Sequence, residues 1–207
     1  TYDELKSRIS NEYLRFFQIS NEYQMKMIKI WHYLPQLLKK YSSEKTNYSV
    51  LCEARENVYK KYYKDCNYPA ATVIGIEGDK VLIYFIASAC KSYKAIENDR
   101  QISSYNYPQN LFQEKPMFSR AVKFLSRDCS TKKILISGTA SIKGYKSMHE
   151  KEVVKQLNES IKNYKIFVDI ENNFSNVVRV YLSKYQEKQT EEVLTILNEV
   201  FSMDKYI

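Results

Sequence analysis

The chain has 207 residues, a length typical of one ordinary domain or of two small units that share a core. Hydrophobic residues make up 44% and charged residues 27%, which indicates a globular protein rather than a disordered one. Only 4 glycines and 4 prolines are present, which excludes collagen-like chains, Gly-rich linkers and repetitive β architectures with many turns. Lys and Arg number 32 against 24 Asp and Glu, so the net charge of +8 favours an anionic partner.

The basic residues are scattered along the chain, and the longest runs are pairs such as Lys60-Lys61. The sequence contains no zinc finger, RNP-like aromatic motif or Gly-rich RNA loop, so we expect no nucleic-acid partner. The cysteines at 52, 66, 90 and 129 have no CxxC spacing and do not cluster with the two histidines, so we expect no metal site and a reduced, cytoplasmic protein. No apolar run approaches the length of a membrane span, and we expect no membrane partner.

The first third of the chain is predicted to be helical. Residues 3–41 repeat apolar side chains near helical spacing, with an interruption at Ser20-Asn21 that caps a second helix. Pro35 bends or ends that second helix. After the polar loop 42–47, residues 48–64 form the next predicted helix.

The pattern changes at residue 70. Two β-branched runs, 70–76 and 80–87, are joined by Glu77-Gly78-Asp79, which predicts a β-hairpin. Further strands are expected at 100–105, 133–142 and 176–183, and further helices at 118–125, 150–171 and 190–201. This order of strands and helices predicts an α/β fold, arranged as an α+β sandwich.

A cluster of small residues follows the predicted strand near residue 136. The run Ser137-Gly138-Thr139-Ala140-Ser141 offers backbone N–H groups and hydroxyls that a ligand can approach closely. The alternative interpretation is a strand of small residues packed beneath a helix. No GK[ST] sequence follows, so this is not a Walker motif.

Two further segments carry polar groups suited to binding. Arg120 follows Phe118 at a predicted helix start, where its guanidinium can present a fork to a carboxylate; the alternative is an ordinary surface arginine. His32, beside the only tryptophan, Trp31, is expected to be a buried histidine with structural hydrogen bonds rather than a base. The sequence shows no Ser-His-Asp order, HExxH motif or nucleophile elbow, so the residues themselves indicate an α/β domain with a carboxylate-binding cleft.

Five segments in order resemble one enzyme family, and Ser137-Gly138-Thr139-Ala140-Ser141-Ile142 with Gly144 is similar to its Ser-Gly-Thr-Ala-Ser-Ile-Val-Gly signature. The five are Lys29–Pro35, Tyr48–Arg55, Tyr68–Gly75, Ile96–Ala121 and Ser137–Gly144. The first resembles the family's Arg-Ile-Trp-Asn-Tyr-Ile-Pro, so that Lys29 stands where the family has arginine. The chain thereby resembles the chorismatases, whose catalytic domain has the Rid (YjgF-like) fold.

The resemblance implies a mixed sheet with helices packed on one face, preceded by a helical N-terminal segment. We therefore expect residues 1–66 to form a helical segment of the family's N-terminal part and residues 67–207 to form the Rid/YjgF-like domain. Rid proteins are trimers with sites between subunits, whereas chorismatases carry an internal second domain. The resemblance therefore leaves a monomer and a Rid-type trimer as alternatives.

The resemblance also implies a reaction and a set of binding residues. Family members cleave the enolpyruvyl ether of chorismate to pyruvate plus a dihydroxycyclohexadiene carboxylate or a hydroxybenzoate, without a metal or organic cofactor. The two carboxylates of chorismate call for separate cations, which match two arginines here. The substrate-binding residues that the resemblance implies are Arg55, Tyr107, Arg120, Gly138, Thr139, Ala140 and Tyr48.

The catalytic acid of the family is a glutamate near the C-terminus, and no residue of this chain matches it. We expect that glutamate to lie beyond Ile207, in a family member that is shortened at both ends. Two alternatives belong to other classes of function. One is a non-catalytic Rid-fold protein that binds chorismate or another aromatic carboxylate, and the other is a nucleic-acid-binding or RNA-processing module suggested only by the net charge of +8 and the Rid-like fold.

Overall fold

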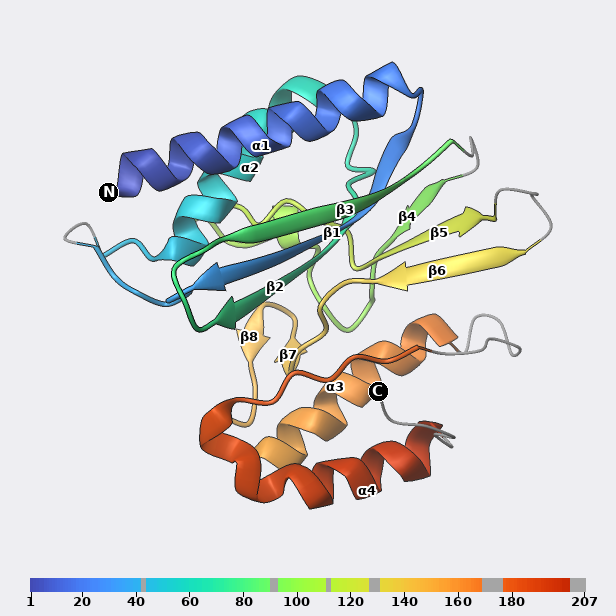
Figure 1. Ribbon diagram of the computed structural model, residues 1–207. Coiled ribbons are helices and arrows are strands. Elements are labelled where there is room, and N and C mark those ends of the chain that lie inside the picture. Colours follow the sequence, from blue (N-terminus) through green and yellow to red (C-terminus); the bar gives the residue numbers. More distant parts are fainter. Residues whose placement is uncertain (42–43, 90–92, 111–112, 127–130, 169–176, 202–207) are drawn as a thin grey trace. The chain divides into compact units, whose positions relative to one another are not determined.

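The computed structural model describes the chain apart from residues 42–43, 90–92, 111–112, 127–130, 169–176 and 202–207 (Figure 1). It divides into two compact units, residues 1–138 and residues 139–207, each with its own packed elements. Within its described residues, no helix is long and apolar enough to cross a bilayer. Strands and helices occur in both units, so the predicted mixed α/β class is confirmed.

Two helices and a three-stranded sheet form the first part of unit 1. They are α1 Tyr2–Glu22, β1 Lys26–Pro35, α2 Asn47–Tyr62, β2 Ala70–Ile76 and β3 Leu82–Ser88. The sheet has the order β2-β1-β3, with β1 parallel to β2 and antiparallel to β3. Both helices cover the same face of this sheet (Figure 1).

Local sequence explains where these two helices begin. The Thr1 hydroxyl accepts a hydrogen bond from the Glu4 backbone N–H, and Thr46 does the same for Ser49 at the start of α2. Such caps satisfy donors that the first helical turn leaves unpaired. The predicted helix over 48–64 is therefore confirmed in α2, and the first part of the predicted helix over 3–41 is confirmed in α1.

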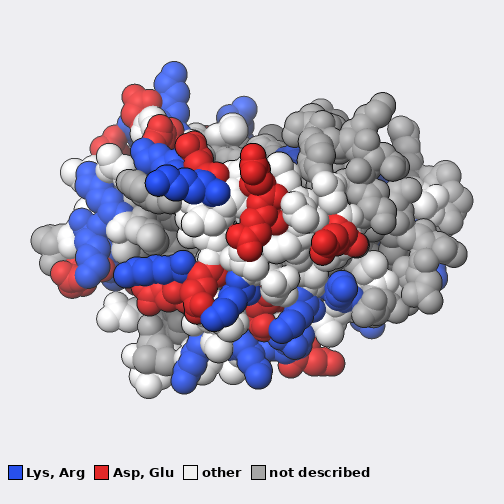
Figure 2. Space-filling model, turned by 90° about the horizontal axis from the view of Figure 1, so that it is seen from below, with Lys and Arg blue, Asp and Glu red and all other residues white. Residues whose placement is uncertain are grey.

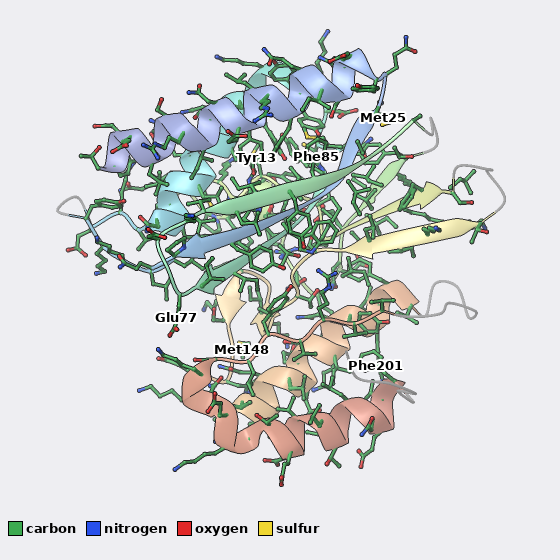
Figure 3. The ribbon with its side chains drawn as sticks, viewed as in Figure 1. Tyr13, Met25, Glu77, Phe85, Met148 and Phe201 are labelled. Carbon is green, nitrogen blue, oxygen red and sulfur yellow. The ribbon has the colours of Figure 1, made fainter. Side chains whose placement is uncertain are left out.

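The core of unit 1 lies between the two helices and the sheet. Tyr13 projects from α1 toward the sheet, on the side where Phe85 of β3 lies (Figure 3). The rings of Phe16 and Phe85 approach to 4.5 Å between centroids, and Tyr13 meets Tyr59 of α2 edge-on at 5.5 Å. Aromatic packing of this kind, rather than aliphatic packing alone, accounts for part of the tyrosine excess of the chain.

The helix expected over 26–35 is wrong, because this segment is the central strand β1. Ile30 and Leu34 join the core beneath α1 and α2, whereas Trp31 stacks on Tyr84 on the other face of the sheet at 5.0 Å. A central strand is buried on both faces, so its apolar residues do not alternate cleanly with polar ones. Because apolar residues in consecutive positions also match the spacing of a helix, this run led to the wrong prediction of a helix.

The strands expected at 70–76 and 80–87 exist as β2 and β3, but they do not form a hairpin. β1 lies between them and pairs with both, matching Trp31 with Thr72 on one side and with Tyr84 on the other. The turn around Gly78, at φ +104°, therefore connects strands that are separated by β1.

A second, antiparallel sheet of unit 1 contains β4 Lys94–Ile96, β5 Ala121–Leu125 and β6 Lys132–Ile136, in that order. The helix expected over 118–125 is wrong, since β5 occupies most of it. The expected strand over 100–105 is also wrong, because this segment leads into the 3-10 helix η1 Ser104–Asn106. The strand expected over 133–142 stops at Ile136, before the small residues.

Unit 2 contains a short β-ladder followed by helices. Its elements are β7 Ile142–Lys143, β8 Lys146–Ser147, α3 Val153–Val168, η2 Lys184–Gln189 and α4 Thr190–Phe201. Val153 of α3 packs with Val193 and Leu197 of α4, which confirms the two expected C-terminal helices. The strand expected over 176–183 is wrong for residues 177–183, which form no regular element, and residue 176 lies outside the described part.

Candidate functional site

Arg55 is the largest fully buried side chain of unit 1. It projects from α2 with 0% of its surface exposed, and none of its three guanidinium nitrogens forms a hydrogen bond with a described residue. A guanidinium is ionised at any ordinary pH and carries five donors. A buried cation without such partners is costly, because its donors have lost their contacts with water.

Arg120 directly precedes β5 and is also buried, with 5% exposed. Its Nη2 donates to the Tyr107 hydroxyl at 2.8 Å and to the Ile102 carbonyl oxygen at 2.7 Å, while its buried Nε has no partner among the described residues. The structure therefore brings together Tyr107 and Arg120, two residues that the family resemblance pairs. The two hydrogen bonds fix the guanidinium in one orientation.

The ring of Phe118 is close to both arginines. The Arg55 guanidinium carbon is 5.9 Å from the centre of this ring, and that of Arg120 is 5.2 Å from it. The Tyr107 ring is also close to Arg120, at 5.7 Å. Cation–π contacts of this kind hold guanidinium groups without using their N–H donors. Two cations on one phenyl ring form a site of high positive charge with free donors.

Tyr48 completes this cluster from the first turn of α2. Burial raises the pKa of its phenol, as do Cys52 and Tyr107, whereas the positive charge of Arg55 lowers it. The phenol therefore lies within electrostatic range of both Arg55 and Tyr107, and it is neutral at ordinary pH. We define the arginine cluster as Tyr48, Arg55, Tyr107, Phe118 and Arg120.

A buried serine holds the loop that leads to the arginine cluster. The Ser104 hydroxyl lies against the Pro116 and Phe118 carbonyl oxygens and also accepts a hydrogen bond from the Phe118 backbone N–H. One hydroxyl thus fixes the backbone on which the Phe118 ring is mounted. The loop 106–118 is anchored at its end, as expected of a loop that carries functional side chains.

Gly138 lies at the end of unit 1, beside β2. Its N–H donates to the Ala71 carbonyl oxygen at 2.9 Å, and the Ser137 N–H donates to the Arg120 carbonyl oxygen at 2.9 Å. The Ser137-Gly138 pair therefore links β2 to the backbone of Arg120. Thr139 and Ala140 follow directly in the chain as the first residues of unit 2, so their roles at the site remain predictions.

The glycine at 138 meets a steric requirement. A Cβ at this position would lie 3.2 Å from Thr72 Cγ2 and 3.4 Å from Thr72 Cα. The Gly138→Ala substitution should lower the free energy of unfolding by about 1–3 kcal/mol through overpacking, measured by denaturant unfolding. Adding Thr72→Ser removes the clashing methyl and should recover part of this loss; strictly additive effects in the double-mutant cycle would contradict the steric explanation.

Lys29 and His32 are buried side chains of β1, and both form hydrogen bonds with Thr72 of β2. Lys29 Nζ donates to Thr72 Oγ1 at 2.7 Å and to the Ile136 carbonyl oxygen at 2.8 Å, and burial lowers its pKa to about 7. His32 Nδ1 donates to the Thr72 carbonyl oxygen, and the Tyr13 hydroxyl donates to its Nε2. Burial, with Arg55 and Lys29, lowers the pKa of His32 to about 3, so the interpretation of His32 as a structural histidine is confirmed.

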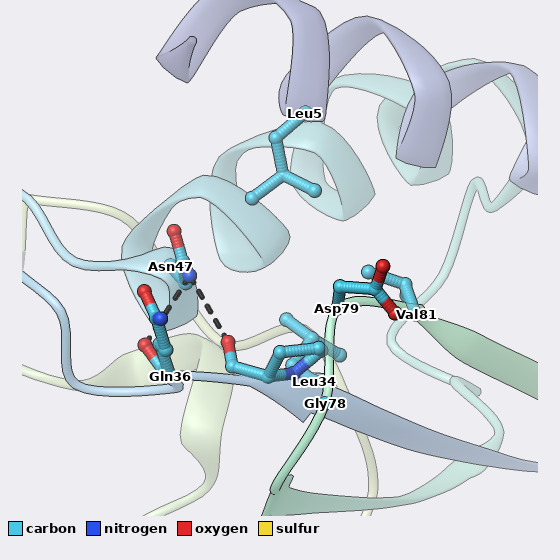
Figure 4. A pocket seen from close by; sticks show the side chains of 8 residues that line it. Leu5, Leu34, Gln36, Asn47, Gly78, Asp79 and Val81 are labelled. Atoms are coloured by element: carbon cyan, nitrogen blue, oxygen red, sulfur yellow. Dashed lines mark hydrogen bonds between the residues drawn. The ribbon is translucent and has the colours of Figure 1, made fainter.

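A pocket of unit 1 lies elsewhere. It has a volume of about 280 Å³ and lies near Leu5, Leu34, Asn47 and Asp79, where the Asn47 amide donates to the Pro35 and Gln36 carbonyl oxygens (Figure 4). None of its lining residues belongs to the arginine cluster. Asp79 is its one charged residue, so this pocket does not suit a dianion.

The charge of the surface is mixed where it is visible. On the face that Figure 2 shows, Lys and Arg side chains alternate with Asp and Glu side chains and do not gather into one basic patch. Elsewhere on the chain, Lys45 pairs with Glu114, and Lys6 with Glu53. The described part of the face in Figure 2 therefore shows no continuous basic surface for a polyanion.

Two residues near the arginine cluster were not identified as site residues from the sequence. Phe118 and Glu97 lie within the segment Ile96–Ala121, but the resemblance assigns neither of them a role. The segment around Phe118 was expected to begin a helix, whereas Ser119 forms an isolated parallel bridge with Ala70 and β5 begins at Ala121.

Three comparisons with known proteins agree. Residues 2–87 match the model of a protein family described as chorismatase FkbO/Hyg5-like, N-terminal. The chain is 27% identical to a 3-hydroxybenzoate synthase from Streptomyces hygroscopicus over 75% of this chain and 47% of that protein. It is 32% identical to a chorismatase from Streptomyces rapamycinicus over 50% of this chain and 31% of that protein.

A solved structure gives the same result for the fold. A chorismatase crystal structure superposes with a TM-score of 0.79 at 20% identity, covering 93% of this chain and 61% of that one. The chain spans less than half the length of the two curated relatives. Residues 2–87 match the chorismatase N-terminal family model, the two curated relatives are similar to this chain at 27% and 32% identity, and the chain shares its fold with a chorismatase.

Proposed function

We propose that the protein binds chorismate through Arg55 and Arg120 and cleaves its enolpyruvyl ether to release pyruvate. The second product is a dihydroxycyclohexadiene carboxylate or a hydroxybenzoate. The observation that carries the proposal is the placement of two buried guanidinium groups on one phenyl ring, at 5.9 Å and 5.2 Å from its centre.

The geometry of the arginine cluster supports a dicarboxylate as ligand. Chorismate carries two carboxylates on a ring-shaped body, and two separately mounted guanidinium groups can each take one of them. Tyr107 already orients one guanidinium through its hydrogen bond to Arg120. The Phe118 ring offers an apolar surface between the two charges, which suits the carbocyclic ring of the substrate.

The names of the relatives support the same substrate. Those of known function are a 3-hydroxybenzoate synthase and a chorismatase. The matched stretch of the first covers 75% of this chain. Thr139 and Ala140 complete the proposed binding residues at the start of unit 2.

The test is to incubate the purified full-length protein with chorismate and to measure pyruvate with a coupled dehydrogenase. We expect pyruvate to appear in proportion to the chorismate consumed, with a second product detected by chromatography. A folded preparation that binds chorismate in calorimetry without releasing pyruvate would instead favour the alternative, a non-catalytic protein that binds aromatic carboxylates. Absence of both binding and pyruvate would reject both readings.

A further inference from the structure

We propose that Lys45 is a positioning residue of the arginine cluster, because it ties residues 113–118, the Phe118 segment, to the helix that carries Arg55. This inference deepens the proposed function and rests on it, since its consequence is a change in the affinity for chorismate. Lys45 lies between Lys29–Pro35 and Tyr48–Arg55, outside the five segments that resemble the family, so the resemblance assigns it no role.

Lys45 bridges two carboxylates that come from different parts of unit 1. It lies in the loop just before α2, and its Nζ is 2.6 Å from Glu114 Oε1 and 3.1 Å from Glu53 Oε2. Glu53 belongs to α2, whereas Glu114 belongs to the Phe118 segment. One ammonium group therefore joins the Phe118 segment to the helix.

The contact between Lys45 and Glu114 is shielded from solvent. The side chain of Lys45 is 27% exposed and that of Glu114 is 13% exposed. An exposed ion pair contributes little because water and salt screen it, but a shielded pair is screened less. The hydrogen bond with Glu114 is also the main reason why the pKa of Lys45 is raised above its ordinary value, so this lysine is charged at any ordinary pH.

A second contact with α2 lies one residue further along the Phe118 segment. The Lys115 backbone N–H donates a hydrogen bond to Glu56 Oε2 at 3.2 Å. Glu56 directly follows Arg55 in α2. Two consecutive residues, Glu114 and Lys115, are therefore held by polar groups at this helix before the chain reaches Phe118.

The ligand-free arginine cluster needs support from outside. Arg55 and Arg120 carry like charges close to one phenyl ring, and these charges repel each other. The hydrogen bonds of Ser104 and Tyr107 hold the segment on the side of Arg120, and they do not involve α2. Without Lys45, the segment is less firmly held against α2, so the binding of chorismate would also have to order it, which weakens the affinity.

The experiment compares Lys45→Met with Lys6→Met in the full-length protein. Lys6 is a matched control, because it also pairs with Glu53, at 2.5 Å, and is similarly exposed, but it reaches Glu53 from α1. We expect Lys45→Met to raise the calorimetric Kd for chorismate about fivefold to twentyfold, and Lys6→Met to leave it within about twofold.

The kinetics and a conservative variant distinguish positioning from catalysis. We expect the kcat of Lys45→Met for pyruvate release to stay within about twofold of the wild type, since a bound ligand has already ordered the segment. Lys45→Arg keeps a cation within reach of Glu114, so its Kd should stay within about threefold of the wild-type value.

Hydrogen exchange tests the tether without any ligand. The backbone N–H groups of Lys115 and Phe118 both form hydrogen bonds with side chains, to Glu56 and to Ser104. We expect both amides to exchange about tenfold faster in Lys45→Met than in the wild type, and at close to the wild-type rate in Lys6→Met.

The outcomes separate this inference from the proposed function. Unchanged exchange in Lys45→Met overturns the positioning role, and so does faster exchange with an unchanged Kd. An equal rise of Kd in Lys45→Met and Lys6→Met also overturns it, because the loss would then come from the fold in general. A wild type that does not bind chorismate rejects the proposed function and the positioning role with it, whereas a wild type that binds leaves the variants to decide the role of Lys45.

Discussion

Replacing Arg55 by methionine is expected to stabilise the protein and to abolish its binding of chorismate. The guanidinium is fully buried, and its three nitrogens have no hydrogen-bonding partner among the described residues. Methionine fills a similar volume without the charge, and exchanges of buried charges for apolar side chains are often stabilising by about 1–4 kcal/mol. Removing one of the two proposed carboxylate anchors should cost about 2–5 kcal/mol of binding free energy.

Both quantities can be measured on the same preparation, by denaturant unfolding and by calorimetry with chorismate. The matched control is Arg8→Met on α1, because Arg8 is exposed and forms an ion pair only with Glu4 one turn away. Its change should alter the free energy of unfolding by no more than about 0.5 kcal/mol and leave binding intact. A marked loss of stability in Arg55→Met would show that the free protein already pairs this guanidinium.

The opposite signs expected for stability and binding are typical of a binding site. A cation held ready for an anion is under-satisfied until the ligand arrives, so the free protein is less stable than it could be. The buried hydroxyl of Tyr59 also has no hydrogen-bonding partner among the residues that the structure describes. Polar groups left unsatisfied in this way indicate a binding site better than the pocket near Asp79 does, whose one charged residue is an acid.

The sequence was sufficient for the helices that have one apolar face. α2 and α4 lie close to where their spacing predicts, because each buries one side against its own unit and exposes the other. β1 could not be predicted in the same way. It is a central strand with buried residues on both faces, and its apolar run fits either period until the pairing partners are known.

The error at β1 also explains the hairpin error. With residues 26–35 assigned to a helix, β2 and β3 had no other partner and were paired with each other. The structure inserts β1 between them, a non-local pairing that involves residues about 40 and 50 positions away in the sequence. No local signal around Gly78 reports such an insertion, since a tight turn follows the same residue preferences in either case.

The candidate site was predictable where it depended on residue type and resemblance. Arg55, Tyr107 and Arg120 were expected together, and the structure places both guanidinium groups close to the Phe118 ring and Tyr107 beside Arg120. The complete burial of the Arg55 guanidinium required tertiary information, because it depends on which side chains pack around α2. Whether a buried polar group lacks hydrogen-bonding partners depends on tertiary packing, so it cannot be predicted from one sequence alone.

The stability of the protein is expected to depend on pH through Lys29. Burial lowers the pKa of this lysine from 10.5 to about 7, although two acceptors bind its ammonium group. Below about pH 7, the folded and unfolded states both carry the charge, and only the folded state bears the desolvation penalty. Between pH 7 and 10.5, unfolding takes up a proton, so the free energy of unfolding rises with pH, and above 10.5 the penalty is gone.

The Lys29→Met variant isolates this contribution. Its free energy of unfolding should exceed that of the wild type most at low pH, and the difference should shrink by about 1.4 kcal/mol per pH unit through the window above pH 7. Lys26→Met, at the exposed start of β1, is the control and should shift stability by no more than about 0.5 kcal/mol at every pH. A difference that stays flat for Lys29→Met would mean that the folded state solvates this ammonium.

Arginine, which the resemblance aligns with Lys29, cannot lose its proton, so Lys29→Arg should remove the pH dependence and keep the penalty.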